Sequence, residues 1–135
     1  MQGSSVSSKR VLLVDDEISN TEVLGLVLAQ EGYEVTLCGD GRQALAGLSA
    51  GMPDLLITDF MMPLLNGAEL VQALRELPGG RDVPVVLMSG APESALRTYG
   101  IHYEVFLRKP FSLSELLDTV HRLLDGPRLQ PAGTR

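Results

Sequence analysis

The chain has 135 residues, of which 44% are hydrophobic and 21% are charged. This size and composition predict a single globular domain with one sizeable core, and they exclude a disordered chain. The formal net charge of −6 argues against nucleic acid or an anionic membrane as a direct partner.

The N-terminal residues and the single cysteine indicate the setting. Residues 1–10 contain no hydrophobic run that could act as a signal peptide, and no stretch is apolar for long enough to span a bilayer. Cys38 allows no disulfide within the chain, and its apolar neighbours predict a small core residue. We therefore expect a cytoplasmic protein.

The first part of the chain predicts two strands around one helix. Residues 11–14 and 34–38 are short apolar runs typical of buried strands. Between them, Ser19 and Glu22 match a capping box, so a helix is expected to begin there and to end near Gly32. Its inward stripe is expected to comprise Val23, Leu24, Val27 and Leu28.

The middle of the chain repeats this pattern. Asp40 is expected to cap a second helix that ends at Gly51, and residues 55–58 are expected to form the third strand. Asn66 is expected to cap a third helix, which the sequence PGG at residues 78–80 terminates.

The last part predicts two more strands, at residues 84–88 and 104–107. Only residues 92–99 are available for a fourth helix, and they lack a strong apolar stripe, so we expect a short or irregular helix followed by a loop. Ser112 and Glu115 match a capping box at the start of a final helix. The stripe of that helix is expected to comprise Leu113, Leu116, Leu117, Val120, Leu123 and Leu124.

Five strands that alternate with helices predict a parallel sheet covered on both faces, which is a doubly wound α/β fold. Right-handed crossovers favour the strand order 2-1-3-4-5 of flavodoxin-like (βα)5 folds. The domain is expected to span residues 9–125. Residues 1–8 are expected to be a flexible tail, and residues 126–135 a flexible tail or the start of a linker.

Polar residues follow the carboxyl ends of the predicted strands, where open parallel sheets place their sites. In the predicted order, Asp59 stands one strand spacing, about 5 Å, from Asp15 and Asp16 on one side and from Ser89 on the other. Lys109 starts about twice as far away, a distance that its long side chain can cover. These five residues are therefore predicted to form one site.

The predicted cluster has a definite chemistry. Two unit charges about 4 Å apart repel by about 4 kcal/mol at an effective dielectric near 20, so three carboxylates favour a divalent cation. Mg²⁺ fits better than Ca²⁺ because it needs only one or two carboxylates beside water and phosphate oxygens. Lys109 and Ser89 can hold phosphoryl oxygens by charge and by a hydrogen bond. Beside Mg²⁺, the Asp59 carboxylate can act as a nucleophile and form an acyl phosphate.

The sequence resembles a response-regulator receiver domain of two-component signalling over about residues 9–125. The resemblance rests on "VLLVDDE", "LLITDFMMPLLNG", "VVLMSG" and "FLRKPF", in that order and at compatible spacings. It implies that Asp59 is the phosphoacceptor. It also implies that Asp15, Asp16, Asp59 and the backbone carbonyl of Met61 hold Mg²⁺, for which Mn²⁺ can substitute.

The resemblance further implies a conformational switch. Ser89 matches the switch hydroxyl, Lys109 the family lysine, and Phe106 the aromatic residue that changes rotamer on activation, while the bond from Lys109 to Pro110 is expected to be cis. The implied phosphoryl donor is a sensor histidine kinase or a histidine phosphotransfer protein. The implied target is an output domain or a protein partner, with a phosphorylation-dependent homodimer as an option. Such a domain is a signalling switch and not an ordinary enzyme, although it catalyses its own phosphorylation and slow autodephosphorylation.

Several alternatives stay open. The acidic run at residues 15–17 could be a charge cluster at a helix N-terminus, and Asp59 with Lys109 could be a structural ion pair. The scaffold could also serve as a phosphorylation-independent protein-binding module. A Mg²⁺-dependent aspartyl-phosphate phosphohydrolase usually needs a second aspartate two residues after the nucleophile, where this chain has Met61.

Two features depart from the family pattern. The stretch 89–100 is shorter than usual and "IHYEV" before Phe106 is longer, so the surface that many relatives use for dimerisation is expected to differ. Met61 and Ala91 are apolar where some relatives place acids or amides that orient the hydrolytic water, so we expect a long-lived phosphoryl group. Met61 and Met62 are expected to be packing residues and not sulfur ligands. His102 and His121 have no second ligand at metal spacing and are expected to be surface or hydrogen-bonded histidines.

Overall fold

The structure is a computed structural model, and it describes residues 8–125. Its strands are β1 (Arg10–Val14), β2 (Glu34–Cys38), β3 (Leu55–Asp59), β4 (Val85–Ser89) and β5 (Val105–Arg108). Its helices are α1 (Ile18–Gln30), α2 (Gly41–Ala50), α3 (Gly67–Glu76), the 3₁₀-helix η2 (Glu93–Tyr99) and α4 (Leu113–Leu124). The strands pair in parallel in the order β2-β1-β3-β4-β5, which confirms the predicted doubly wound α/β topology.

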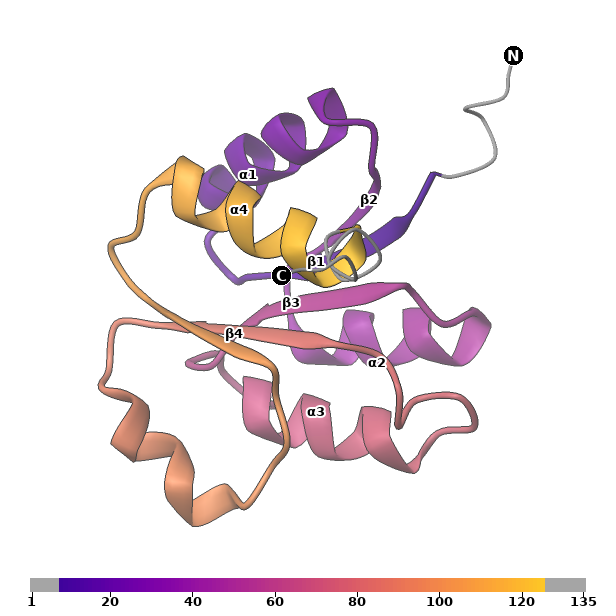
Figure 1. Cartoon of the computed structure of the whole chain (residues 1–135). Helices are drawn as coiled ribbons and strands as arrows, with labels where there is room; N and C mark the ends of the chain where they lie inside the picture. Colours follow the sequence, from indigo (N-terminus) through magenta and orange to yellow (C-terminus); the bar gives the residue numbers. More distant parts are fainter. Residues whose placement is uncertain (1–7, 126–135) are drawn as a thin grey trace, which may run out of the picture.

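Side chains of the central strands alternate between two hydrophobic clusters, one on each face of the sheet. In β1, Val11 and Leu13 belong to one cluster, and Leu12 and Val14 belong to the other. The helices α1 and α4 cover the first face, and α2, α3 and η2 cover the second (Figure 1). The predicted burial on both faces is therefore confirmed for β1, β3 and β4, whereas the edge strands β2 and β5 are partly exposed.

The bounds predicted for the second strand are confirmed, and those of the other four strands differ from the prediction by one residue at one or both ends. The third strand continues to Asp59, the fourth runs from Val85 to Ser89, and the fifth ends at Arg108. The reason is that these last residues still lie in the ladder, where Asp59 is in register with Met88 and Ser89 with Arg108. Two of the predicted site residues therefore stand on the sheet itself, which holds them more rigidly than a loop would.

Three of the four predicted helix starts are confirmed. Asp40 accepts a hydrogen bond from the Gln43 amide at the start of α2. Asn66 and Ser112 form complete capping boxes at the starts of α3 and α4. Each such cap satisfies an amide that has no partner within its helix and is worth about 1 kcal/mol.

The start predicted for α1 is wrong. The helix begins at Ile18, with Glu17 as its N-cap and no side-chain cap, so Ser19 and Glu22 form no capping box. The cause lies in the preceding turn, because the Glu17 amide donates a hydrogen bond to Asp15 Oδ1 at 2.9 Å. The Glu17 carbonyl then accepts the first helical hydrogen bonds, and the helix starts before Ser19 is reached.

The inward stripe of α1 is also narrower than predicted. Val23 is 54% exposed, and Gly25 is buried on the inner face instead. Leu37 of β2 lies over Gly25 so closely that a Cβ there would be 2.8 Å from a Leu37 methyl group. At the start of α4, Leu113 is likewise 41% exposed and does not belong to the buried stripe. Both helices therefore present apolar side chains outward.

The fourth helix is short and irregular, as predicted. The segment Glu93–Tyr99 is a 3₁₀-helix in which only Leu96 is buried. It ends at Gly100, whose φ of 61° lies in the left-handed region that glycine adopts most readily. This segment is therefore the least anchored element of the sheet's second face.

Three further expectations concern the ends, membranes and Cys38. The tails predicted at residues 1–8 and 126–135 lie outside the described residues, except for Ser8. Between residues 8 and 125, no helix is both long and apolar enough to cross a bilayer. Cys38 is buried at the end of β2, as predicted, and burial raises the pKa of its thiol.

Candidate functional site

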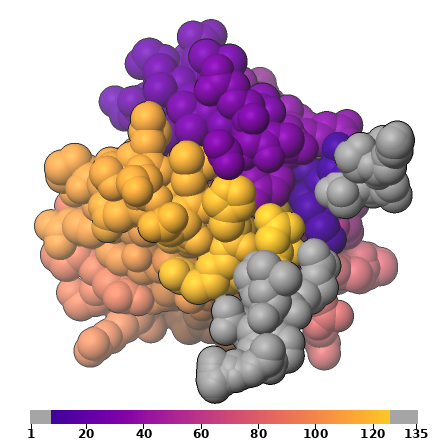
Figure 2. All heavy atoms as spheres, turned by 45° about the horizontal axis from the view of Figure 1, so that its top comes forward, coloured from indigo at the N-terminus to yellow at the C-terminus, as the bar shows by residue number. Residues whose placement is uncertain are grey.

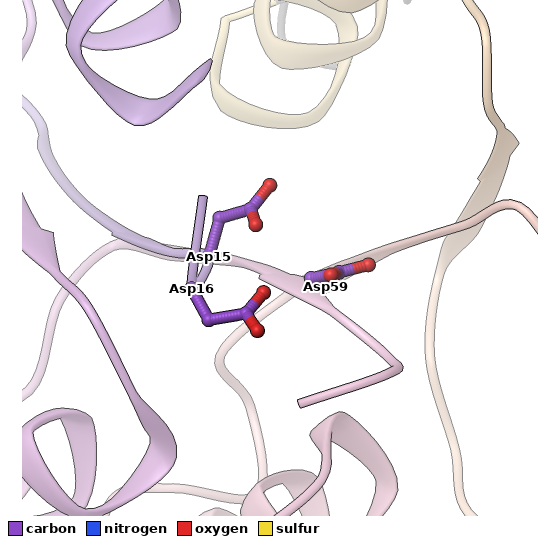
Figure 3. A group of neighbouring side chains, drawn as sticks. All are labelled: Asp15, Asp16 and Asp59. Carbon is purple, nitrogen blue, oxygen red and sulfur yellow. The ribbon is translucent and has the colours of Figure 1, made fainter. Parts of the chain in front are cut away.

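The ends of β1 and β3 bring three carboxylates together. Val14 pairs with Thr58 in the parallel ladder, so the residues that follow them, Asp15 and Asp59, emerge side by side. Asp16 comes next in the chain, and carboxylate oxygens of the three aspartates lie within 4.8 Å of one another. Figure 3 shows the three side chains projecting to the same side of the strand ends. The predicted convergence of these residues is confirmed.

Lys109 supplies positive charge to this cluster. Its Nζ lies 3.2 Å from Asp15 Oδ2 and 3.4 Å from Asp59 Oδ1. Its backbone amide donates a hydrogen bond to the Ser89 carbonyl at 2.8 Å, which fixes the base of the side chain beside β4. The peptide bond between Lys109 and Pro110 is cis, as the resemblance implied. The ion pair considered as a structural alternative is thus present within the site.

The ionisation of the site is controlled mainly by burial. Burial raises the pKa of Asp59 from 3.8 to about 6; the Lys109 charge opposes this rise, and the charges of Asp15 and Asp16 add to it. Burial lowers the pKa of Lys109, but the carboxylates of Asp59 and Asp15 outweigh that effect and raise it above the ordinary value. At neutral pH one ammonium therefore faces three carboxylates, which leaves Asp59 ionised and incompletely neutralised.

Asp15, Asp16 and Asp59 could together hold a divalent cation. All three offer carboxylate oxygens, the ligands that hard cations prefer, and none of the three is a nitrogen or sulfur donor. Few protein oxygens converge here, so water and phosphate oxygens would complete the shell, which suits Mg²⁺ better than Ca²⁺. A bound cation would also relieve the excess negative charge. The residues present therefore fit Mg²⁺.

The two predicted switch residues lie on neighbouring strands. Ser89 is buried, and its hydroxyl oxygen accepts a hydrogen bond from the Ala91 amide at 2.9 Å. Phe106 is partly buried against the hydrophobic cluster on the face covered by α3 and η2. Met62 is buried as predicted, but the packing role predicted for Met61 is wrong because its side chain is 60% exposed. Met61 lies in the loop between β3 and α3, outside the sheet.

One contact at the site was not predicted from the sequence. The Gly67 amide donates a hydrogen bond to the Phe60 carbonyl at 2.8 Å. A Cβ at Gly67 would lie 2.4 Å from the Asp59 carbonyl oxygen, so only glycine lets α3 begin this close to Asp59. The pair Asn66-Gly67 does not by itself reveal this approach, because the same pair is typical of an ordinary helix start.

The two histidines lie away from the carboxylate cluster. His121 contacts the Tyr33 hydroxyl at 2.9 Å and Glu31 at 3.0 Å, and His102 contacts Glu104 at 3.0 Å. Neither belongs to a group of side chains that could share a metal ion within the described part of the chain. Their predicted roles as surface or hydrogen-bonded residues are confirmed.

Comparison with known proteins places this site in a family. The response regulator receiver domain model matches residues 11–121. The chain is 35% identical over 126 residues to the transcriptional regulatory protein PcoR of Escherichia coli, which covers 92% of this chain and 55% of that protein. It is 36% identical over 125 residues to the response regulator MprA of Mycobacterium ulcerans, which covers 91% of this chain and 53% of that protein. The chain thus spans about half the length of the curated relatives it matches.

Solved structures agree with this match. Chemotaxis response regulator CheY4 of Vibrio cholerae superimposes with a TM-score of 0.81 at 32% identity, covering 87% of this chain and 100% of that one. A second structure is the receiver domain of sensor histidine kinase PA1611 from Pseudomonas aeruginosa, which has a magnesium ion in its active-site cleft. It superimposes with a TM-score of 0.80 at 28% identity, and the match covers 87% of this chain and 98% of that one. Since the family model covers most of the sequence and the strand order and carboxylate cluster agree with it, the chain belongs to the response regulator receiver domain family.

Proposed function

We propose that this chain accepts a phosphoryl group on Asp59, with Mg²⁺, or Mn²⁺ in its place, held by Asp15, Asp16, Asp59 and the backbone carbonyl of Met61. One observation carries the proposal: three carboxylates converge within 4.8 Å, and Lys109 Nζ lies 3.4 Å from Asp59. One ammonium does not neutralise three carboxylates, so the site favours a further cation. That cation and Lys109 together suit an incoming phosphoryl group.

Transfer to Asp59 forms one bond and breaks one bond. A carboxylate oxygen of Asp59 attacks phosphorus, and the new O–P bond forms as the P–N bond of a phosphohistidine donor breaks. The leaving imidazole keeps the electron pair of that bond and takes a proton from solvent. Lys109 holds a phosphoryl oxygen by charge. Mg²⁺, when bound, supplies neutralisation of the phosphoryl oxygens.

Phosphorylation is proposed to act next on the ends of β4 and β5. In the unphosphorylated structure the Ser89 hydroxyl oxygen accepts a hydrogen bond from the Ala91 amide. A phosphoryl group on Asp59 would offer the Ser89 hydroxyl new acceptors for its proton. As Ser89 turns toward the phosphoryl group, Phe106 follows into the vacated space, and its partial burial leaves it free to do so. The added charge thereby shifts a two-state equilibrium that a partner can detect.

The donor is proposed to be a sensor histidine kinase or a histidine phosphotransfer protein that docks over α1. Along this helix Ile18, Val23 and Leu26 are 63%, 54% and 62% exposed. A groove of about 550 Å³ has Val23 and Leu113 in its wall and reaches Lys109. Figure 2 shows α1 on the molecular surface beside α4. An exposed apolar surface next to the site is typical of a protein interface.

The downstream target is proposed to be an output domain or a separate protein, with a phosphorylation-dependent homodimer as an option. Relatives of about twice this length, PcoR among them, support an output domain. The net charge of −6 supports a domain that contacts neither nucleic acid nor membrane directly. We propose a cytoplasmic switch spanning residues 9–125, which catalyses only its own phosphorylation and slow autodephosphorylation.

Two other functions remain candidates. A phosphorylation-independent binding module is favoured by the 3₁₀ form of η2, which changes the surface beside β5. A Mg²⁺-dependent aspartyl-phosphate phosphohydrolase is disfavoured because Met61, which is apolar, stands where such an enzyme needs an acid. A binding module would not need the carboxylates of Asp15, Asp16 and Asp59 to lie together, so their convergence favours the phosphoacceptor function.

The test is the intact mass of the protein after incubation with acetyl phosphate and Mg²⁺. We expect a gain of one phosphoryl group, about 80 Da, that is absent in Asp59→Asn and absent without Mg²⁺. No gain from acetyl phosphate and from a panel of histidine kinases would favour the binding module instead.

A further inference from the structure

Tyr99, the last residue of η2, contacts both ends of the loop that follows Asp59. Its ring packs edge-on against Phe60, with centroids 5.5 Å apart and an interplanar angle of 78°. Its hydroxyl oxygen accepts a hydrogen bond from Asn66 Nδ2 at 3.2 Å. Phe60 directly follows Asp59, and Asn66 caps α3. A single side chain of η2 therefore touches the loop where it leaves the sheet and where it enters the helix.

The loop at residues 60–66 is fixed at its ends and strained in its middle. The Phe60 amide donates to the Met88 carbonyl, and the Phe60 carbonyl accepts from the Gly67 amide, both at 2.8 Å. Between these anchors, Leu64 has a φ of 71°, a left-handed conformation that costs a non-glycine residue free energy. Leu64 is also 77% exposed, so no packing compensates for the strain. Phe60 is joined covalently to Asp59 and by a hydrogen bond to Gly67, the first residue of α3, so a backbone displacement at Asp59 reaches Phe60 directly and Asn66 through Gly67.

Few other contacts hold η2. Among its own residues only Leu96 is buried. The Gln72 side chain donates to the Tyr99 carbonyl at 3.2 Å, and Arg75 Nη2 donates to the His102 carbonyl at 2.9 Å, so α3 holds the chain just beyond the helix. Leu96 packs η2 against the core, and bonds from Gln72 to the Tyr99 carbonyl and from Tyr103 to Glu93 hold its two ends. The ring and hydroxyl of Tyr99 are the contacts that join η2 to the loop after Asp59.

We propose that Tyr99 transmits phosphorylation of Asp59 to η2. When a displacement at Asp59 moves Phe60 and the start of α3, the contacts of Tyr99 with Phe60 and Asn66 weaken, and η2 becomes more mobile. The inference rests on the proposed function and adds a route to η2 that does not pass through Phe106 on β5. The physical requirement is only that the docked state of η2 loses favourable contacts in the phosphorylated protein, which shifts the population toward the loosened state.

Hydrogen–deuterium exchange of the amides at residues 93–103 tests this coupling, with intact mass followed in the same samples. In the wild type, exchange is expected to accelerate at least about fivefold once acetyl phosphate and Mg²⁺ have modified Asp59. In Tyr99→Leu, exchange is expected to be fast before modification and to change less than twofold after it, although the mass gain remains. Tyr99→Phe keeps the ring and loses the bond to Asn66, so an intermediate response is expected.

Tyr103→Phe is the matched control. It removes a tyrosine hydroxyl that donates to Glu93 within the same segment, and it keeps the ring and both contacts that Tyr99 makes with Phe60 and Asn66. We expect it to retain the acceleration of the wild type. Unchanged exchange in phosphorylated wild-type protein, or a wild-type response in both Tyr99 variants, would overturn the coupling and leave the proposed function standing. Absence of the mass gain would overturn the proposed function and the coupling with it.

Discussion

Lys109 and Asp59 form an ion pair in which the Lys109 ammonium is shared with a second carboxylate, that of Asp15. Their Nζ to Oδ1 distance is 3.4 Å, but the same ammonium lies 3.2 Å from Asp15. Asp59 is only 6% exposed, and its burial raises its pKa to about 6 despite the cation. Without a bound metal the site is therefore electrostatically costly, as expected of a site that accepts charged ligands.

The first prediction concerns stability and pH in the absence of metal. The pKa of Asp59, about 6, lies above its unfolded value of 3.8, so the native protein binds more protons between those pH values and loses stability as the pH rises through them. At about 1.4 kcal/mol per pKa unit, the difference between about 6 and 3.8 sets an upper bound of about 3 kcal/mol. Asp59→Asn does not titrate, so it should be more stable than the wild type by about 1–3 kcal/mol near pH 7.5.

Urea unfolding in EDTA at about pH 4.5 and about pH 7.5 checks this prediction. The advantage of Asp59→Asn should fall to about a third at the lower pH, where Asp59 is protonated in the native wild type but still mostly ionised in the unfolded chain. Asp118→Asn removes an exposed carboxylate from α4 and should show no such trend. An advantage that is the same at both pH values would contradict the assigned cause.

Mg²⁺ should stabilise the wild type through the carboxylate cluster. A ligand at 100 times its Kd stabilises the native state by about 2.7 kcal/mol, so the melting temperature should rise with added Mg²⁺. Asp16→Asn should reduce the rise, and it should fold normally because Asp16 is exposed and its loss leaves no buried charge. Asp118→Asn is again the control and should show the full rise in melting temperature. Equal rises in the wild type, Asp16→Asn and Asp118→Asn would argue against this cluster as the metal site.

The phosphoryl group on Asp59 should last for minutes or longer. The Ala91 side chain has no hydrogen-bonding group and the exposed Met61 thioether is only a weak acceptor, so neither holds a water molecule firmly in position for attack. Met61→Asn should shorten the lifetime severalfold, whereas Leu64→Asn, in the same loop, should not. The decay of the mass gain after donor removal measures both, and a half-life of seconds in the wild type would contradict the expectation.

Two serines should differ in their effect on stability although both match a capping sequence. Ser112 accepts a hydrogen bond from the Glu115 amide at 3.0 Å, so Ser112→Ala should cost about 1 kcal/mol. Ser19 lies inside α1 and caps nothing, so Ser19→Ala should change stability by less than about 0.5 kcal/mol. Chemical denaturation of both variants decides, and equal losses would mean that α1 starts later than the structure shows.

The docking surface on α1 can be separated from the chemistry. Val23→Glu places a charge in the wall of the groove beside Lys109 without touching the carboxylates. It should slow transfer from a kinase that labels the wild type by at least about tenfold, which corresponds to about 1.4 kcal/mol. Labelling by acetyl phosphate should be unchanged. Gln30→Glu adds the same charge at the far end of α1 and should leave both labelling reactions at the wild-type rate. If Val23→Glu slows labelling by the kinase and by acetyl phosphate equally, the substitution has damaged the carboxylate site and the docking surface is not supported.

Some features could be predicted because their signals are local. Short apolar runs identify the five strands, and Asn66 and Ser112 cap their helices through side chains that reach amides three residues away. Asp59 and Asp15 end up side by side because parallel strands share one carboxyl edge, which follows from the strand order. These predictions needed no knowledge of packing.

Other features depend on contacts between distant segments. Val23 is exposed because Leu37 of β2 occupies the space above Gly25 and rotates the inner face of α1 away from the predicted stripe. The start of α1 depends on a hydrogen bond to Asp15, whose orientation depends in turn on Lys109. These contacts join residues that are far apart in the sequence, so a periodic pattern of hydrophobic residues cannot predict them.

The sequence by itself determined the fold class, the order of elements and the residue types at the strand ends, because hydrophobic period and capping chemistry act over a few residues. Only the tertiary structure decided how the charges balance and what holds η2. The pKa of Asp59 depends on burial and on three charged neighbours, and the contacts of Tyr99 join segments more than thirty residues apart. Both depend on distances in space, and electrostatics and packing respond to those distances rather than to spacing along the chain.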